Sequence, residues 1–164
     1  MKILSEQELR EHFTQYSDFR FQNSALVRQY SSRGRLTRKN AMAHAITEAL
    51  TSCLPAFALI DPSDVKGDTV GAHLLSVWRG YQDEPRSIEE APYHLFENLH
   101  DRVSMFFLVS LSLHSSWRTC IWSMDASTSI LMSEREYFHV NCSRSDLLNL
   151  LDERWREISM MVTA

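Results

Sequence analysis

Residues 103–113, VSMFFLVSLSL, decide the fold that the sequence predicts. Upstream of Val103 the apolar residues recur at helical spacing, whereas inside this stretch they alternate with a period of two. One face carries an unbroken apolar series, and serines occupy much of the other: the apolar positions are Val103, Met105, Phe107, Val109, Leu111 and Leu113. Because strict alternation is typical of a half-buried strand, we predict a β-strand here.

Three further strands are predicted downstream, within residues 117–124 (WRTCIWSM), 128–132 (TSILM) and 134–142 (EREYFHVNC). The segments between them, HSS and DAS, are short turns. Short connections join antiparallel neighbours, so we predict a four-stranded antiparallel meander over about 103–142.

The N-terminal half is predicted to be helical, with helices near residues 5–13, 24–30, 38–53, 69–81 and 91–102. Ser5 and Glu8 have the spacing of a capping box, and Leu4 and Leu9 that of its hydrophobic staple. The run AFALI, 56–60, is either a strand or a buried connector. In the helix 69–81 we expect the apolar side chains to face inward: Val70, Leu74, Val77, Trp78 and Tyr81.

The segment 146–161, DLLNLLDERWREISMM, has an apolar stripe at helical spacing and is predicted to be a C-terminal amphipathic helix packed on the sheet. The predicted fold class is therefore α+β, in a single domain over 1–164. The chain has 164 residues, of which 44% are hydrophobic and 23% charged, and this composition excludes a disordered protein.

Several other classes are disfavoured by the sequence. No run of about 18 apolar residues is present, so no membrane span is expected. Cys53, Cys120 and Cys142 are far apart, which predicts no disulfide framework and favours a cytoplasmic protein. The spacing of the histidines and cysteines predicts no metal site, and no cofactor motif is found.

Charge is divided unevenly along the chain, whose net charge is −4. The segment 28–39, RQYSSRGRLTRK, holds five basic residues and no acid, whereas residues 60–101 hold nine acids and three bases. The basic segment has three interpretations: nucleic-acid binding through Arg33, Arg35, Arg38 and Lys39, contact with an acidic protein, or a solvated loop.

Two patterns around this segment point to nucleic acid. Residues 24–30 and 38–50 have the layout of a helix-turn-helix, with Arg38 and Lys39 at the start of the recognition helix. The spacing of Arg38 and His44 resembles the R-x4-6-H signature of the HEPN family of helical ribonucleases. The resemblance covers two residues of an all-helical family, whereas a sheet is predicted here, so no role is transferred from it.

The second predicted strand offers a different surface. It places Trp117 on one face and Arg118 and Trp122 on the other, and neither face is cleanly polar. Trp and Arg are enriched at protein interfaces. Either both faces are buried, or one of them contacts a partner.

No catalytic motif is present, and His44 with Glu48, one helical turn apart, is the only compact acid–base pair. We therefore predict a non-catalytic cytoplasmic protein that binds another protein or itself, as an inhibitor, immunity-type antidote, adaptor or chaperone does. The predicted binding residues are Arg33, Arg35, Arg38, Lys39, Trp117, Arg118 and Trp122. The alternatives are a nucleic-acid-binding module and a small enzyme whose site combines distant histidines and acids.

Overall fold

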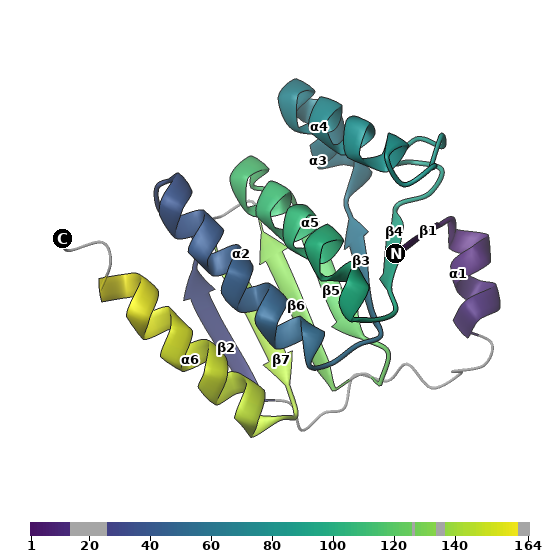
Figure 1. The fold of residues 1–164 in the computed structure, drawn as a ribbon. Coiled ribbons are helices and arrows are strands. Elements are labelled where there is room, and N and C mark those ends of the chain that lie inside the picture. The colour runs from purple at the N-terminus through teal and green to yellow at the C-terminus, as the bar shows by residue number, and fades with distance from the viewer. Residues whose placement is uncertain (14–25, 126, 134–136, 161–164) are drawn as a thin grey trace.

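The computed structural model describes residues 1–13, 26–125, 127–133 and 137–160. Within these residues seven strands form one antiparallel sheet in the order β1-β4-β3-β5-β6-β7-β2 (Figure 1). The strands are β1 (Lys2–Leu4), β2 (Leu26–Ser31), β3 (Ala56–Ile60), β4 (Tyr93–Phe96), β5 (Thr119–Ser123), β6 (Thr128–Ser133) and β7 (Tyr137–Cys142).

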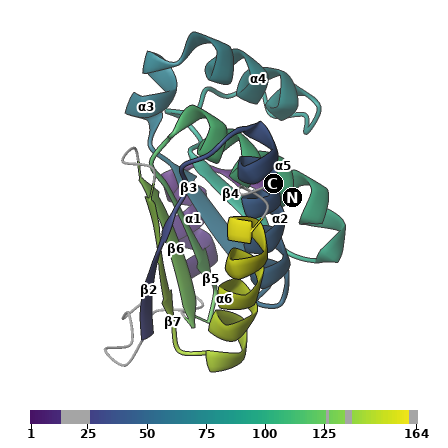
Figure 2. The same ribbon diagram turned by 90° about the vertical axis from the view of Figure 1, so that its left-hand side faces the viewer.

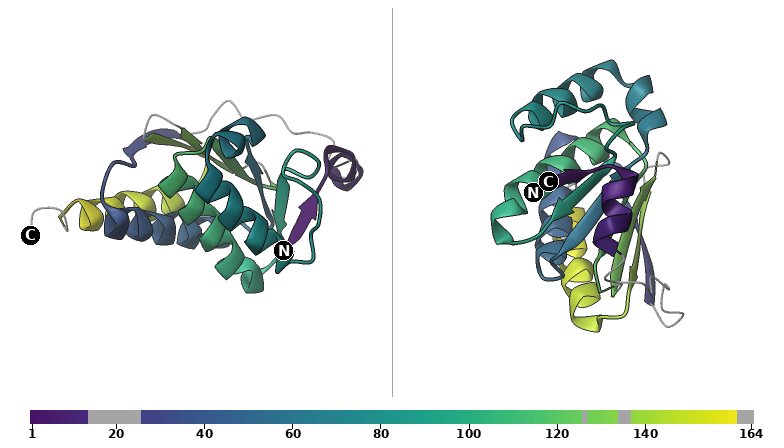
Figure 3. Two further views of the ribbon diagram at one scale, coloured as in Figure 1. Left: turned by 90° about the horizontal axis from the view of Figure 1, so that it is seen from above. Right: turned by 90° about the vertical axis from the view of Figure 1, so that its right-hand side faces the viewer.

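The helices are distributed unequally over the two faces of this sheet. They are α1 (Glu6–Phe13), α2 (Leu36–Thr51), α3 (Pro62–Gly67), α4 (Thr69–Gly80), α5 (Arg102–Ser115) and α6 (Ser145–Met160), with a 3-10 turn η1 (Leu99–Asp101) before α5. Figure 2 shows α2, α5 and α6 together on one face of the sheet. α1 lies near the β1 edge, and α3 and α4 project beyond one end of the strands (Figure 3).

Strand register explains why the helical layer covers one face. Ala58, Ile121, Ile130 and Val140 lie opposite one another on β3, β5, β6 and β7, and all four are fully buried. Directly opposed residues of neighbouring strands point to the same face, so this row forms the floor beneath α2, α5 and α6. On the other face, Leu9 of α1 packs with a smaller cluster that includes Leu4, Phe57 and Leu95.

The stretch 103–113 is helix α5, so the predicted strand is wrong. Apolar residues fill every position from 105 to 109, and this run satisfies helical spacing as well as alternation. The helix buries Met105, Leu108, Val109 and Ser112, which follow the i, i+3, i+4, i+7 pattern. α5 lies between α2 and α4, so its flanks are covered and few polar positions were left to reveal the helical period.

The helical N-terminal half is also only partly correct. Residues 93–96, predicted as helix, form β4 between β1 and β3, and residues 26–31 form edge strand β2 paired with β7. The helix-turn-helix prediction fails with β2. These strands are short and pair with distant segments, so local spacing carries little information about them. AFALI is a strand, β3, in the interior of the sheet.

Other predictions are confirmed. β5, β6 and β7 form the antiparallel meander, and the α+β class holds with a larger sheet than predicted. The capping box is present: the Ser5 amide donates to Glu8 Oε2 at 2.6 Å, and the Glu8 amide to Ser5 Oγ at 3.2 Å. α6 buries Leu147, Leu148, Leu151 and Ile158 against the rest of the helical layer and sheet. The start of the predicted helix 24–30 lies outside the described residues.

Candidate protein-binding surface

Helix α4 is seated on α5 through its first turn. Asp68 caps the helix, and its Oδ1 accepts a hydrogen bond from the Gly71 amide at 2.9 Å. Gly71 is buried so tightly that an added Cβ would lie 2.6 Å from Trp117 Cζ2 and 2.7 Å from Ser115 Oγ, at the end of α5. Farther along, Trp78 stacks on Phe107 with 5.1 Å between ring centroids. These contacts run in opposite directions along the two helices, so α4 and α5 are antiparallel.

The outward side of α4 is apolar, contrary to the inward orientation predicted for it. Val70, Leu74, Val77 and Tyr81 are 71%, 47%, 44% and 82% exposed. Their spacings of four, three and four residues place them in one row, which we call the α4 stripe. Only Trp78 of the predicted inward set is largely packed, because Gly71, Leu75 and Arg79 form the buried side.

Two further large apolar residues, one in η1 and one in α5, are exposed. Val103 lies one helical turn before Phe107, the residue on which Trp78 of α4 stacks, and Leu99 precedes it in η1. They are 78% and 68% exposed. The α4 stripe with Leu99 and Val103 is the α4–α5 surface. Large exposed apolar patches mark interaction sites on soluble domains.

The side of α4 opposite the stripe is fixed by a buried arginine. Arg79 is 3% exposed and donates to the carbonyl oxygens of Ala91 at 2.9 Å, Arg86 at 3.0 Å and Ser87 at 3.1 Å. These bonds tie α4 to the segment that leads into β4. Arg79 is the only acid or base in α4 apart from His73, so the exposed side of this helix carries neither an acid nor a Lys or Arg.

His94, on β4, completes the packing beneath α4. It is fully buried, stacks on Trp78 with 5.8 Å between ring centroids, and its Nε2 accepts from Arg79 Nη1 at 3.5 Å. Burial first, and the Arg79 charge second, lower the pKa of His94 to about 3. The imidazole is therefore neutral near pH 7 and serves as part of the core.

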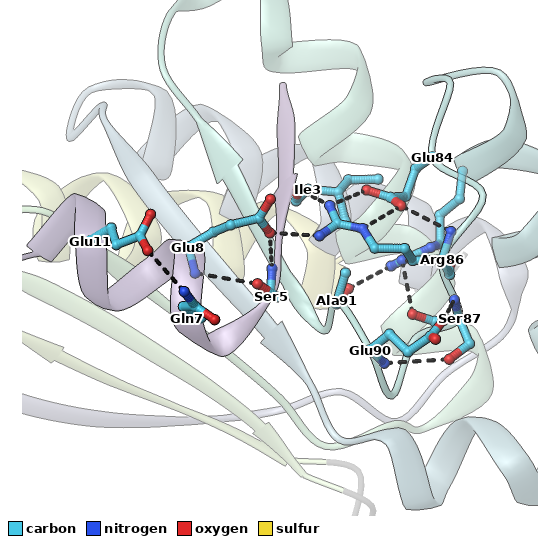
Figure 4. A network of polar contacts seen from close by, with 11 residues as sticks. Ile3, Ser5, Gln7, Glu8, Glu11, Glu84, Arg86, Ser87, Glu90 and Ala91 are labelled. Atoms are coloured by element: carbon cyan, nitrogen blue, oxygen red, sulfur yellow. Dashed lines mark hydrogen bonds and ion pairs between the residues drawn. The ribbon is translucent and has the colours of Figure 1, made fainter.

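Arg86 joins the same segment to the N-terminal elements (Figure 4). Its guanidinium donates to Glu84 at 2.6 Å, to Glu8 of α1 at 2.6 Å and to the Ile3 carbonyl oxygen at 3.0 Å. The Ser5 amide and Arg86 together lower the pKa of Glu8 to about 2. This network holds residues 84–91 in place, and it supports α4 through the Arg79 contacts.

A hollow of about 650 Å³ lies between α3, α4 and residues 84–90, on the side of α4 away from the stripe. Its charged groups are largely paired with one another: Lys66 Nζ lies 3.2 Å from Glu89 Oε1, and Arg86 binds Glu84. The hollow therefore presents no concentrated charge of one sign to a ligand.

The predicted basic residues have different environments. Arg33 and Arg35 lie exposed in the connection between β2 and α2. Arg38 packs over Gly34, where an added Cβ would lie 2.5 Å from its Cδ. Lys39 Nζ donates to the Leu113 carbonyl oxygen at 2.9 Å, at the C-terminal end of α5. A cation at that position interacts favourably with the helix dipole, which accounts for Lys39 structurally.

Trp117, Arg118 and Trp122 also differ in burial and in their contacts. Trp117 is 2% exposed and packs against Gly71, so it is not accessible to a partner. Trp122 is half-buried on the opposite sheet face, and its ring centroid lies 6.1 Å from that of Phe57. Arg118 binds Asp64 at 3.0 Å and Asp61 at 2.9 Å, and its hydrogen bonds lower the pKa of Asp64.

The residues that could serve as catalytic groups do not form one site, and each has a structural contact of its own. The Glu48 carboxylate binds Arg154 of α6 at 3.1 Å, and His44 stacks on Phe106 with 4.2 Å between ring centroids. His114 Nε2 donates to Asn40 Oδ1 at 2.9 Å, and burial raises the pKa of Cys120 to about 11. Across the described ranges, no three His, Cys, Asp or Glu side chains are grouped as a metal site would require.

Comparison with models of protein families, with curated proteins and with solved structures gave no match to this chain. In the described part of the chain, no helix has both the length and the apolar character needed to cross a bilayer.

The α4–α5 surface was missed because an apolar row on a helix is ordinarily a core contact. A signal was present in the sequence: the apolar residues of α4 cover both its buried side and the neighbouring α4 stripe, and the helix contains no acid. A helix of that kind is either fully buried or contacts something else with its outer side.

Proposed function

We propose that the protein is a non-catalytic cytoplasmic protein that acts by binding another protein through the α4–α5 surface, as an inhibitor, immunity-type antidote, adaptor or chaperone does. The observation that carries the proposal is the α4 stripe, with its four large apolar side chains between 44% and 82% exposed. Interfaces are rich in aromatic and apolar residues at their centres and poor in charge, and the exposed side of α4 has both properties.

The setting of α4 supports the proposal. Asp68, Arg79 and the contact with Trp117 fix the helix on its inner side, so the α4 stripe is presented by a rigid element. A preorganised surface binds with less loss of conformational entropy than a loop would. The three described cysteines are thiols, which is compatible with a reducing compartment.

Affinity capture from the source cells tests this proposal with a matched pair of substitutions. Leu74 and Leu131 are both 47% exposed, but Leu74 lies in the α4 stripe and Leu131 on β6. We expect wild type and Leu131→Glu to retain the same stoichiometric protein after nuclease treatment, and Leu74→Glu to lose it because a carboxylate would be buried in the interface. Retention of the protein by Leu74→Glu would contradict the proposal.

The nucleic-acid alternative has its own control in the same experiment. Arg33 and Arg35 are the predicted basic residues on the surface, and their simultaneous replacement by Glu reverses that charge. Nucleic acid that is captured by wild type and lost both at high salt and in the Arg33→Glu/Arg35→Glu variant would support that alternative.

A further inference from the structure

The residue spacing of the α4 stripe is the same in both directions along the helix. Val70, Leu74, Val77 and Tyr81 are separated by four, three and four residues, so reversing the helix leaves the spacing unchanged. The same spacing is that of a two-heptad seam, in which two helices pack apolar rows together. A second copy of α4 packed antiparallel would place its Tyr81 opposite Val70 and its Val77 opposite Leu74. The two-fold symmetry would form each of these pairs twice.

Within α4 itself no acid and no exposed Lys or Arg opposes this arrangement, whereas Asp68 and Asp83 flank the two ends of the helix. The exposed positions beside the α4 stripe are Thr69, His73, Ser76 and Gly80, which include no acid and no Lys or Arg. In a two-fold contact each residue meets the same set from the other copy, so like charges at these positions would repel. Their absence leaves no like-charge repulsion between the exposed sides of two α4 helices.

The size of the α4–α5 surface matches the needs of a dimer. With roughly 100 Å² for each Val or Leu side chain and about 200 Å² for Tyr, the exposed fractions offer about 500 Å² of apolar area per copy. A standard interface takes about 800 Å² from each partner, of which about 65% is apolar in homodimers. The surface thus supplies the apolar centre of one such interface.

We infer that the α4–α5 surface binds a second copy of this chain, through antiparallel pairing of the two α4 helices about a two-fold axis. The inference rests on the proposed function, because it names the protein that the same surface binds. The order of residues across the axis, with position 70 facing position 81, is the feature that an experiment can test.

Light scattering and sedimentation equilibrium of the purified full chain, with charge substitutions in the α4 stripe, provide that test. Wild type should have twice the monomer mass of 19.1 kDa. Val70→Glu and Tyr81→Lys should each raise the dimer dissociation constant by at least about tenfold, because each buries an unpaired charge. The double variant Val70→Glu/Tyr81→Lys should regain dimerisation, since the new carboxylate at position 70 of each copy then faces the new ammonium group at position 81 of the other.

Thermal unfolding at protein concentrations low enough for every variant to be monomeric is the control for folding. Under that condition these exposed positions should change stability by no more than about 0.5 kcal/mol. Leu131→Glu should leave the mass unchanged. A monomeric wild type, a dimer that neither single substitution weakens, or single variants that the double does not rescue would each overturn the inference. A monomer that still captures another protein in a Leu74-dependent manner would contradict self-association but not the proposed function. Capture that is independent of Leu74 would contradict binding through the proposed surface.

Discussion

His94 is a titratable side chain placed where protonation is unfavourable. The unfolded chain takes up a proton near the ordinary histidine pKa of about 6.5, whereas the folded protein does so only near a pKa of about 3. Between these values the unfolded state binds more protons, so stability falls as the pH is lowered. His94 therefore supports the fold near neutrality and opposes it in acid.

We expect the free energy of unfolding of wild type to fall between about pH 6.5 and about pH 3 by about 1.4 kcal/mol per pH unit more than that of His94→Gln. Denaturant titrations at several pH values measure both slopes. Glu8 and the other carboxyl groups with lowered pKa contribute equally to the two proteins, so they cancel in the comparison. Equal slopes would show that His94 titrates normally in the folded state.

The packing of helix α4 on α5 depends on Gly71, which has no side chain. A Cβ at Gly71 would lie 2.2 Å from Asp68 Oδ2 and 2.6 Å from Trp117 Cζ2, whereas one at Gly80 would contact nothing within 4 Å. Both glycines belong to the same helix. The difference in stability between their alanine variants therefore reports packing rather than helix propensity.

We expect Gly71→Ala to destabilise the protein by about 1–3 kcal/mol, since overpacking displaces the Asp68 cap or Trp117. Gly80→Ala should be neutral or stabilising by up to about 1 kcal/mol, because alanine favours helix. Thermal or chemical unfolding of the two variants checks the pair. A Gly71→Ala protein as stable as Gly80→Ala would mean that α4 is not packed on Trp117 and Ser115 as described.

The elements that the sequence predicted are those with one clear period. β5, β6 and β7 alternate, α6 has a clean stripe, and Ser5 with Glu8 marks the start of α1 by chemistry that acts locally. α5 was mistaken for a strand because residues 105–109 are apolar without interruption. β2 and β4 are defined by pairing with β7, β1 and β3, which are distant in sequence, so spacing could not reveal them.

The location of the candidate site follows from the topology of the fold. Helix α5 passes between α2 and α4 on one face of the sheet, and α4 lies at its outer side (Figures 1 and 3). That arrangement leaves the α4 stripe exposed and directs Trp117 into the core. The sequence predicted a partner surface on the sheet, whereas the proposed surface is on α4, because residue spacing alone could not show which apolar rows are covered.

Several charged residues join elements of the fold. Lys39 caps α5, and Arg118 and Arg86 bind acidic groups within residues 61–84. Of the basic segment 28–39, Lys39 thus has a structural contact with α5. Arg33 and Arg35 remain the exposed part of the basic segment, and their role in binding stays a prediction.

Site-specific photo-crosslinking in the source cells tests the central claim most directly. A photoreactive phenylalanine analogue replaces Leu74 in one protein and Leu131 in a second, at two positions of equal exposure. The proposed surface predicts a discrete covalent adduct from position 74 and none from position 131, with the adduct containing a second copy of the chain or another protein. No adduct from position 74, or an adduct from position 131 alone, would contradict binding through the α4–α5 surface.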